Sequence, residues 1–188
     1  LTSNIGLAVD TPGLVTFSST VGSGVPGAGI VASINRTGGG LTILKGNTDS
    51  AGTQSFDGDV LFDGPITANA GGLFSVQGAS RLGGDVSILA SSVDLLGAVD
   101  SQGGARSLHV TSPGLIRFGS AIGQTGALQN LLVDGGGATR ITTLVNAADA
   151  KFMNAVDLTG NTLFTGGDVL FAGSLNSLTA GAFGAEFA

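Results

Sequence analysis

Apolar and polar residues alternate along this chain in short stretches, which are separated by glycine, asparagine, aspartate and proline. In the stretch 14–21, Val15, Phe17 and Val21 share one parity, and Leu108 and Val110 alternate with polar neighbours in the same way. A period of two is typical of strands that bury one face. The pattern therefore predicts about eight to a dozen short strands joined by turns.

The composition argues against helices. Glutamate occurs once, as Glu186, and lysine twice, as Lys45 and Lys151, although these residue types normally cover helix surfaces. Glycine occurs 34 times among 188 residues, and aspartate, asparagine, serine and threonine are abundant. These residues favour turns over helical hydrogen bonding. We therefore expect an all-β fold with essentially no α-helix.

Two segments of the chain are similar without gaps. Residues 6–22 read GLAVDTPGLVTFSSTVG and residues 107–123 read SLHVTSPGLIRFGSAIG, with eight identities in seventeen positions at a separation of 101. The similarity continues at shorter separations, since Gly-Gly-Asp-Val at 83–86 returns at 166–169. The decreasing separation implies that residues are missing from turns of the second segment, because turns tolerate deletions better than packed strands do. The sequence predicts two modules, 6–106 and 107–188, with no linker between them.

Self-similarity at this scale favours a stack of coils over a sandwich. Helical crossovers, which other parallel sheets need, have no candidate segment, and small residues recur where successive coils would approach closely. We therefore expect residues 1–188 to form a single continuous, right-handed parallel β-helix, or β-solenoid. With roughly 20–25 residues in each coil, the chain holds about eight coils. At about 4.8 Å for each coil, the body is about 40 Å long.

Charge and composition exclude several classes of protein. The formal net charge is −6 and the seven cations are spread along the chain, so nucleic acid is not an expected partner. A run of about 18 apolar residues does not occur, which argues against membrane insertion. Cysteine is absent, which excludes disulfides, thiolate metal sites and cysteine nucleophiles. Tryptophan and tyrosine are absent too, which removes the usual aromatic platforms for ligands.

The order of the motifs adds a family resemblance. The string SLxVxxxGxxxFxxxxG at 107–123 is followed by LLV, then by GGG and TxI, and later by FxxxV and GGDV. This order resembles the β-strand repeats in the stalks of large bacterial surface proteins of the filamentous haemagglutinin and autotransporter-adhesin kind. The resemblance covers about residues 6–177. It implies an extracellular β-helix on the bacterial cell surface, with a structural role in adhesion or in a biofilm matrix.

Catalytic residues are not expected. His109 is the only histidine, its counterpart in the first module is Ala8, and no GxSxG nucleophile motif occurs. We therefore interpret His109 as a solvent-facing strand residue and the chain as a protein without enzymatic activity. The closest acidic cluster is Asp57, Asp59 and Asp63, which regular alternation would place on one face of a strand. It is a weak Ca²⁺ candidate, and apart from that no cofactor or metal is expected, because aspartates of this kind commonly stabilise turns.

The interior of the coils should be filled by apolar side chains, of which phenylalanine is the bulkiest. Stacked in register, these residues would form ladders that fix the spacing of the coils and exclude water. The residues predicted to form the ladders are Phe17, Phe56, Phe62, Phe118, Phe152 and Phe171, with Phe74 and Phe164 as further candidates.

The ends of the chain show no capping segment, although isolated solenoids need caps because open strand edges attract further strands. Head-to-tail contacts that do not close produce filaments. The residues predicted to form such an end-to-end contact are Leu1, Ile5, Leu178, Phe183 and Phe187. The favoured hypothesis is a structural part of a bacterial surface fibre or adhesin stalk. Its expected partners are copies of itself, adjoining repeats of a longer chain, or host or matrix glycans.

Two alternatives stay open. A soluble β-helix could bind or cleave polysaccharides, for which the aspartate cluster offers the closest paired carboxylates. A flat row of threonines could bind ice, but that requires threonine at one position on every coil. Thr16 is matched by Arg117 in the second module, which argues against such a row.

Overall fold

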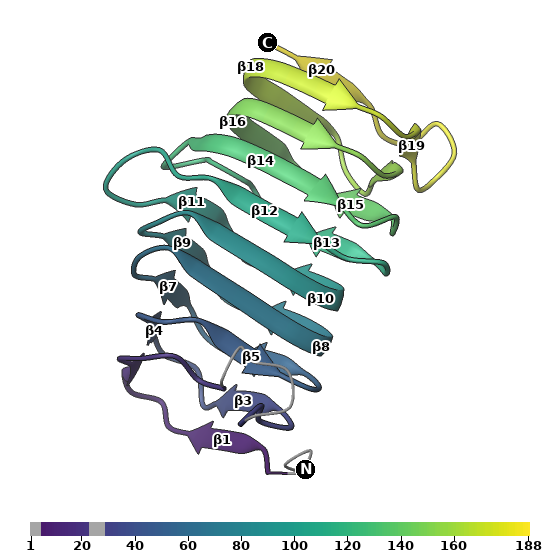
Figure 1. The fold of residues 1–188 in the computed structure, drawn as a ribbon. Helices are drawn as coiled ribbons and strands as arrows, with labels where there is room; N and C mark the ends of the chain where they lie inside the picture. The colour runs from purple at the N-terminus through teal and green to yellow at the C-terminus, as the bar shows by residue number, and fades with distance from the viewer. Residues whose placement is uncertain (1–4, 23–28) are drawn as a thin grey trace.

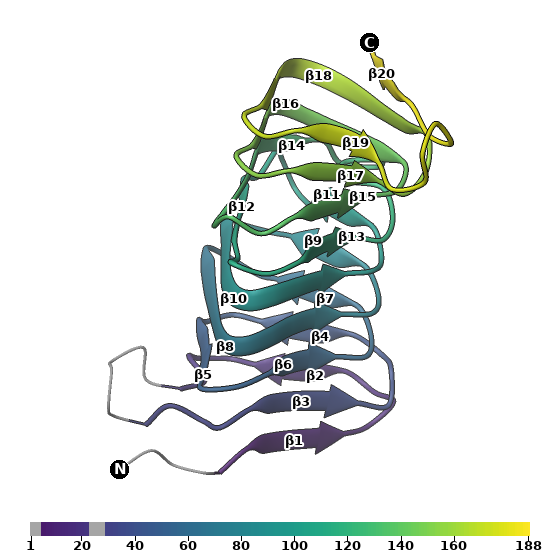
Figure 2. The same cartoon turned by 90° about the vertical axis from the view of Figure 1, so that its right-hand side faces the viewer.

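The computed structural model describes residues 5–22 and 29–188, and these residues form strands and connecting turns with no helix. The strands stack in parallel as a β-solenoid of about eight turns (Figure 1). The expected all-β solenoid is therefore confirmed. The first strand, β1, and the last strand, β20, lie at opposite ends of the stack, as the turned view also shows (Figure 2). A helix able to cross a membrane is not found among the described residues.

Each coil passes through three strand positions, which form three faces of the solenoid. Face 1 consists of β1 (Leu7–Asp10), β3 (Ile34–Thr37), β6 (Gln54–Phe56), the ends of β8 (Ile66–Val76) and β10 (Val86–Leu95), β13 (Ile116–Phe118), β15 (Thr139–Ile141), β17 (Val156–Leu158) and β19 (Leu175–Ser177). Face 2 consists of β2 (Val15–Phe17), β4 (Thr42–Leu44), β7 (Val60–Phe62), β9 (Ser80–Leu82), β11 (Val99–Ser101), the bridge residue Ile122, the starts of β16 (Leu144–Phe152) and β18 (Thr162–Phe171), and β20 (Ala185–Phe187). Face 3 consists of β5 (Thr48–Ser50), the starts of β8 and β10, β12 (Leu108–Thr111), β14 (Leu128–Asp134), and the ends of β16 and β18.

The coils differ in length, although their strands stay in register. On face 1, Val9 lies opposite Arg36 near the N-terminal end of the stack. Near the other end of the same face, Ile141 lies opposite Leu158, and a much shorter stretch of chain joins these two residues. The corners take up this difference, whereas the paired strands keep the spacing of a parallel sheet. Eight steps of about 4.8 Å make the described stack about 38 Å long, close to the expected length.

Alternation within each strand divides its residues between the interior and the surface. In β7, Val60 and Phe62 are buried, and Leu61 between them is only partly covered. Because neighbouring coils are in register, inward residues line up in rows along the stack, as Leu44, Phe62 and Leu82 do. The rows form one hydrophobic core that extends through the solenoid.

Glycine at the corners allows successive coils to approach closely. A Cβ atom on Gly137 would lie 1.7 Å from the carbonyl oxygen of Gly114 on the preceding coil. A Cβ atom on Gly58 would lie 1.9 Å from the carbonyl oxygen of Gly40. Gly58 and Gly137 do not have a positive φ, so it is the lack of space, not the backbone conformation, that requires glycine there.

The two similar sequence segments share a local structure but lie on different faces. β1 and β2 are joined by a corner in which the Gly13 amide donates to Thr11 Oγ1 at 3.2 Å. β12 and β13 are joined by a corner in which the Gly114 amide donates to Ser112 Oγ at the same distance. The first corner leads from face 1 to face 2 and the second from face 3 to face 1. The separation between the two segments is thus not a whole number of coils, and the stack continues from β10 to β12 across position 106.

The number of strands exceeds the expectation, because the described residues contain twenty. Many of the strands are only three residues long, such as β4 and β9. A three-residue strand contains too little alternation to be recognised in the sequence. The long strands β8 and β10 bend from face 3 to face 1, which places two faces within one element.

Candidate functional site

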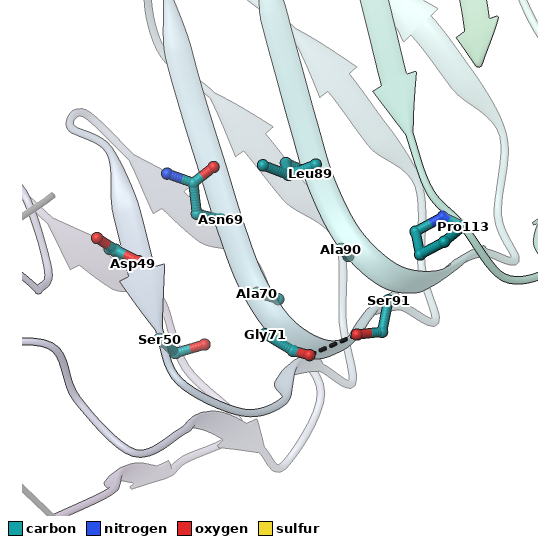
Figure 3. Close-up of a pocket in the computed structure, with 9 residues that line it drawn as sticks. All are labelled: Asp49, Ser50, Asn69, Ala70, Gly71, Leu89, Ala90, Ser91 and Pro113. Atoms are coloured by element: carbon teal, nitrogen blue, oxygen red, sulfur yellow. Dashed lines mark hydrogen bonds between the residues drawn. The ribbon is translucent and has the colours of Figure 1, made fainter. Parts of the chain in front are cut away.

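The groove on face 3 is lined by residues from β5, β8, β10 and the corner at Pro113 (Figure 3). Its volume is about 380 Å³. Leu89 is 50% exposed, and at the bend of the face the hydroxyl of Ser91 donates to the carbonyl oxygen of Gly71. Asp49 is the only titratable residue in the lining. The groove can therefore hold a small or extended ligand, but it contains no pair of groups for acid–base catalysis.

His109 lies on the same face and forms the one histidine–carboxylate pair of the described residues. Its Nε2 is 3.0 Å from Oδ2 of Asp134, which is on the neighbouring strand β14. The Thr111 hydroxyl lies 3.1 Å from the same ring nitrogen. A serine–histidine–aspartate relay uses both ring nitrogens, one toward the nucleophile and one toward the carboxylate. Since both partners of His109 meet Nε2, this arrangement is a surface ion pair in geometry and does not form a relay.

The pKa of Asp134 lies below its ordinary value. Partial burial acts to raise this pKa, but the Thr111 hydroxyl, the hydrogen bond with His109 and the charge of His109 together outweigh the burial. The carboxylate form of Asp134 is therefore favoured in the folded chain. The expectation that His109 faces solvent agrees with its half-exposed side chain.

The structure separates Asp57 from the other two residues of the aspartate cluster. β6 ends at Phe56 and β7 begins at Val60, so Asp57 belongs to the corner between two faces. The expected placement of all three aspartates on one regular strand does not hold. Gly58 lies in this corner, where it approaches the carbonyl oxygen of Gly40 on the preceding coil.

The carboxylates of Asp59 and Asp63 already have partners. Arg81 Nη2 donates to Asp59 Oδ2 at 3.0 Å, and the amide of Ala79 donates to Asp59 Oδ1 at 2.9 Å. Lys45 Nζ lies 3.3 Å from Asp63 Oδ2. Within residues 5–22 and 29–188, no group of three or more histidine, cysteine, aspartate or glutamate side chains is placed to hold a metal ion. Calcium binding by this cluster stays a prediction.

The predicted ladder residues occupy inward positions. Phe56, Phe62, Phe118 and Phe152 are buried, and Phe17 and Phe171 are partly buried against the core. Rings on neighbouring coils stack in two places near the C-terminal end: Phe152 on Phe171 with centroids 5.3 Å apart, and Phe164 on Phe187 at 5.4 Å. In the middle of the stack, aliphatic residues separate the rings, as Val76 and Leu95 do between Phe56 and Phe118. The ladders are therefore mixed in composition.

The threonines do not form a row of the kind that ice binding requires. The outward row that begins at Thr16 on face 2 continues with Ile43, Leu61, Arg81 and Asp100. The central outward rows of faces 1 and 3 also lack neighbouring threonines among the described strands.

The residues predicted to form the end-to-end contact have different surroundings. Leu1 lies outside the described residues. Ile5 is 74% exposed at one end of the stack and Phe187 is 58% exposed at the other. Phe183 is partly buried against the core. Leu178 is 49% exposed, but it follows β19 at a corner and lines a groove on the side of the solenoid.

The hydrophobic core is open at both ends of the described stack. Leu7 and Val9 of β1 and Phe17 of β2 point inward but are only partly buried, whereas the inward residues of β6 and β7 are fully buried. At the other end, Leu175 of β19 is partly buried and Phe187 of β20 is exposed. The inward rows thus continue to both end surfaces without a covering layer in the described residues.

Arg36 is a buried charge that the sequence analysis missed. It is wholly buried and lies in the inward row between Val9 and Phe56. Its Nη2 donates to the carbonyl oxygen of Gly13 at 2.7 Å, and its Nη1 donates to that of Thr37 at 3.1 Å. Its Nε has no hydrogen-bond partner, and no carboxylate pairs with it in the described part of the chain. The one signal for its burial in the sequence was that Arg36 alternates in phase with the apolar Ile34, but a charged residue at such a position is normally assigned to the surface.

Comparison of the chain with protein-family models, curated proteins and solved structures finds no match. The resemblance to the stalks of filamentous haemagglutinin-like and autotransporter-adhesin proteins therefore stays a prediction, which rests on the motifs quoted above.

Proposed function

We propose that this chain is a structural, rod-shaped segment of an extracellular bacterial fibre or adhesin stalk, and that copies of it stack end to end. The observation that carries the proposal is the open core at both ends of the described stack. Apolar surface of this kind marks interaction sites, because its exposure to water is unfavourable. The motif resemblance supports the extracellular bacterial setting.

The two ends are compatible in shape and in strand direction. The C-terminal end offers β19 on face 1 and β20 on face 2, and each of these pairs only with the preceding coil in the described residues. The N-terminal end offers β1 on face 1 and β2 on face 2. A second copy with its β1 beside β19 and its β2 beside β20 would continue both parallel ladders at about 4.8 Å. This contact uses different surfaces on the two copies, so it does not close and gives a filament.

The mechanical role follows from the same geometry. Hydrogen bonds between coils run along the axis of the stack, and the inward rows pack one coil on the next. A load along the axis is therefore shared by the three faces. The side grooves and surface ion pairs do not interrupt this arrangement.

The test is negative-stain electron microscopy across a concentration series, with light scattering on the same samples. We expect filaments with an axial repeat of about 43 Å, because the nine strand levels of face 1 give nine steps of about 4.8 Å from one copy to the next. Each copy has a formal charge of −6, so higher salt should lengthen the filaments by screening the repulsion between copies.

A matched pair of variants separates end contacts from side contacts. Phe187→Asp places a carboxylate on the exposed end surface, and Leu89→Asp places one on the side of the stack. We expect Phe187→Asp to abolish filaments and Leu89→Asp to leave them unchanged. Wild-type samples that contain only 18.2 kDa monomers at high concentration would refute the proposal. Equal effects of the two variants would show lateral association instead.

A further inference from the structure

A second groove, of about 340 Å³, lies at the corner between face 1 and face 2 in the C-terminal half of the stack. Its lining includes two arginines, Arg117 and Arg140, on consecutive coils. The apolar side chains of Leu96 and Leu178 contribute other parts of the lining. The groove therefore combines cationic and apolar surface in a chain whose net charge is negative.

The register places four charges in one outward row of face 1. Asp94, Arg117, Arg140 and Asp157 lie opposite one another on β10, β13, β15 and β17. The two arginines are thus neighbours at the spacing of a parallel sheet, about 4.8 Å between strands. Like charges directly opposite each other on adjacent strands are destabilising unless other charges compensate them.

The compensation is unequal for the two arginines. Arg117 Nη1 lies 3.6 Å from Asp94 Oδ2, which forms an ion pair. Arg140 forms no ion pair within the described residues, although Asp157 lies opposite it in the register. In addition, the Nε of Arg140 is withdrawn from water and has no hydrogen-bond partner. Buried donors without an acceptor are uncommon in folded proteins, because the lost hydration is not replaced.

We propose that Arg140, assisted by Arg117, binds an oxyanion in this groove, namely a carboxylate or phosphate group carried by an organic molecule. A guanidinium group presents two parallel N–H donors that match the oxygens of a carboxylate or phosphate. Such a ligand would accept from the terminal Nη groups of Arg140, because the Nε is withdrawn from water and out of a ligand's reach, and it would relieve the repulsion between the two arginines. The apolar side chains of Leu96 and Leu178 would receive the organic part of the ligand. The site is on the side of the stack, so it does not depend on end-to-end assembly.

Arg81 provides a matched control within the same chain. It is a partly exposed arginine on face 2, and its Nη2 already donates to Asp59 Oδ2 at 3.0 Å. Because a carboxylate already balances its positive charge, Arg81 should attract an oxyanion less strongly than Arg140 does. An anion that responds only to positive surface charge should lose affinity equally when either arginine is replaced.

The experiment is a titration with inorganic phosphate and, separately, with phenyl phosphate, at constant ionic strength with chloride as the balancing ion. Proton–nitrogen correlation spectra report the arginine Nε–H groups directly, and the Arg140 signal is assigned by its loss in Arg140→Gln. We expect the Arg140 Nε–H signal to shift in a saturable way. Tighter binding of phenyl phosphate than of phosphate would show that the apolar lining takes part. Equal affinity for phenyl phosphate and inorganic phosphate would show that the groove binds only the anionic group, and would overturn the proposal that the ligand is an organic molecule.

Variants decide whether the binding belongs to this groove. Arg140→Gln should raise the dissociation constant roughly ten- to hundredfold, the value of one to two charge-assisted hydrogen bonds. Arg140→Lys keeps the charge but lacks the two parallel donors, so it should weaken binding by less. Arg81→Gln should leave binding unchanged. Equal weakening in Arg140→Gln and Arg81→Gln, with circular dichroism spectra like that of the wild type, would overturn the proposal, and so would an unsaturable shift.

Discussion

Substitution of Gly137 by alanine tests whether close stacking of the coils at the corners holds the solenoid together. The added Cβ atom would lie 1.7 Å from the carbonyl oxygen of Gly114, and its next neighbours are also backbone atoms. Backbone atoms cannot move aside by a change of rotamer. Since real Cβ atoms do not approach other heavy atoms within 3.0 Å, the two coils must move apart at this corner.

The magnitude follows from what this separation breaks. The amide of Gly137 donates to the carbonyl oxygen of Ser112 at 3.2 Å, and the amide of Ile116 donates to that of Ala138 at 2.9 Å. Each lost hydrogen bond costs about 1 kcal/mol, and overpacking costs a further 1–3 kcal/mol or so. We therefore expect a loss of about 3–5 kcal/mol in the free energy of unfolding. With an unfolding entropy of about 0.4 kcal/mol/K for 188 residues, Tm should fall by about 8–13 °C.

The assay is thermal unfolding followed by far-ultraviolet circular dichroism, because the chain has no tryptophan or tyrosine to report by fluorescence. Gly184→Ala is the control, since Gly184 has no heavy atom within 4 Å of the added Cβ and no positive φ. Alanine there should be neutral or stabilise by up to about 1 kcal/mol through the unfolded state. A Tm for Gly137→Ala equal to that of Gly184→Ala would refute the steric argument.

Three further predictions concern the core, the ion pair on face 3 and the aspartates beside β7. Phe152→Ala should lower the free energy of unfolding by about 3–5 kcal/mol and Tm by roughly 8–13 °C, because Phe152 is wholly buried. Phe187→Ala, at the exposed end of the stack, is the control and should lower the free energy of unfolding by about 1 kcal/mol or less. The folded pKa of Asp134 is lowered, so its contribution to stability is present above the ordinary aspartate pKa of 3.8 and is lost as the pH falls through the folded value. Asp134→Asn should therefore lower Tm at pH 5–6, and its Tm should converge with that of the wild type once the pH falls below the folded pKa of Asp134. A difference that persists at the lowest pH would contradict this reasoning. Addition of Ca²⁺ or of a chelator should change Tm by less than about 1 °C, because the carboxylates of Asp59 and Asp63 form ion pairs with Arg81 and Lys45. A saturable rise in Tm with Ca²⁺ would show instead that these ion pairs open and that the carboxylates bind the metal.

Prediction from sequence succeeded where a residue's surroundings depend on its own strand. Leu108 and Val110, which alternate with polar neighbours, are buried, and the scarcity of helix-favouring residues predicted the fold class. Prediction from sequence failed where a corner interrupted the alternation. Asp57 was placed on a strand face, although the Asp57-Gly58 pair that follows Phe56 is itself typical of a turn.

Arg36 shows a second limit of prediction from sequence. It shares the inward parity of its strand, but an arginine at such a position is assigned to the surface because burying a charge is costly. The carbonyl groups that receive its guanidinium belong to Gly13, on the preceding coil, and to the adjacent Thr37. Only the stacking of two coils brings the first of these carbonyls within reach.

The sequence by itself determined that this chain forms short strands, that glycine-rich corners separate them, and that the strands stack as coils. Period-two alternation and local turn preferences carry this information within a few residues of each position. The tertiary structure alone decided which side chains on different coils meet, such as His109 with Asp134 and Arg117 with Arg140. The reason is that the coils differ in length and their corners absorb the difference, so the partner of a given side chain on the next coil lies at no fixed separation along the chain. A pattern that extends over a few residues does not contain these lengths, and the pairs become visible only in the stacked structure.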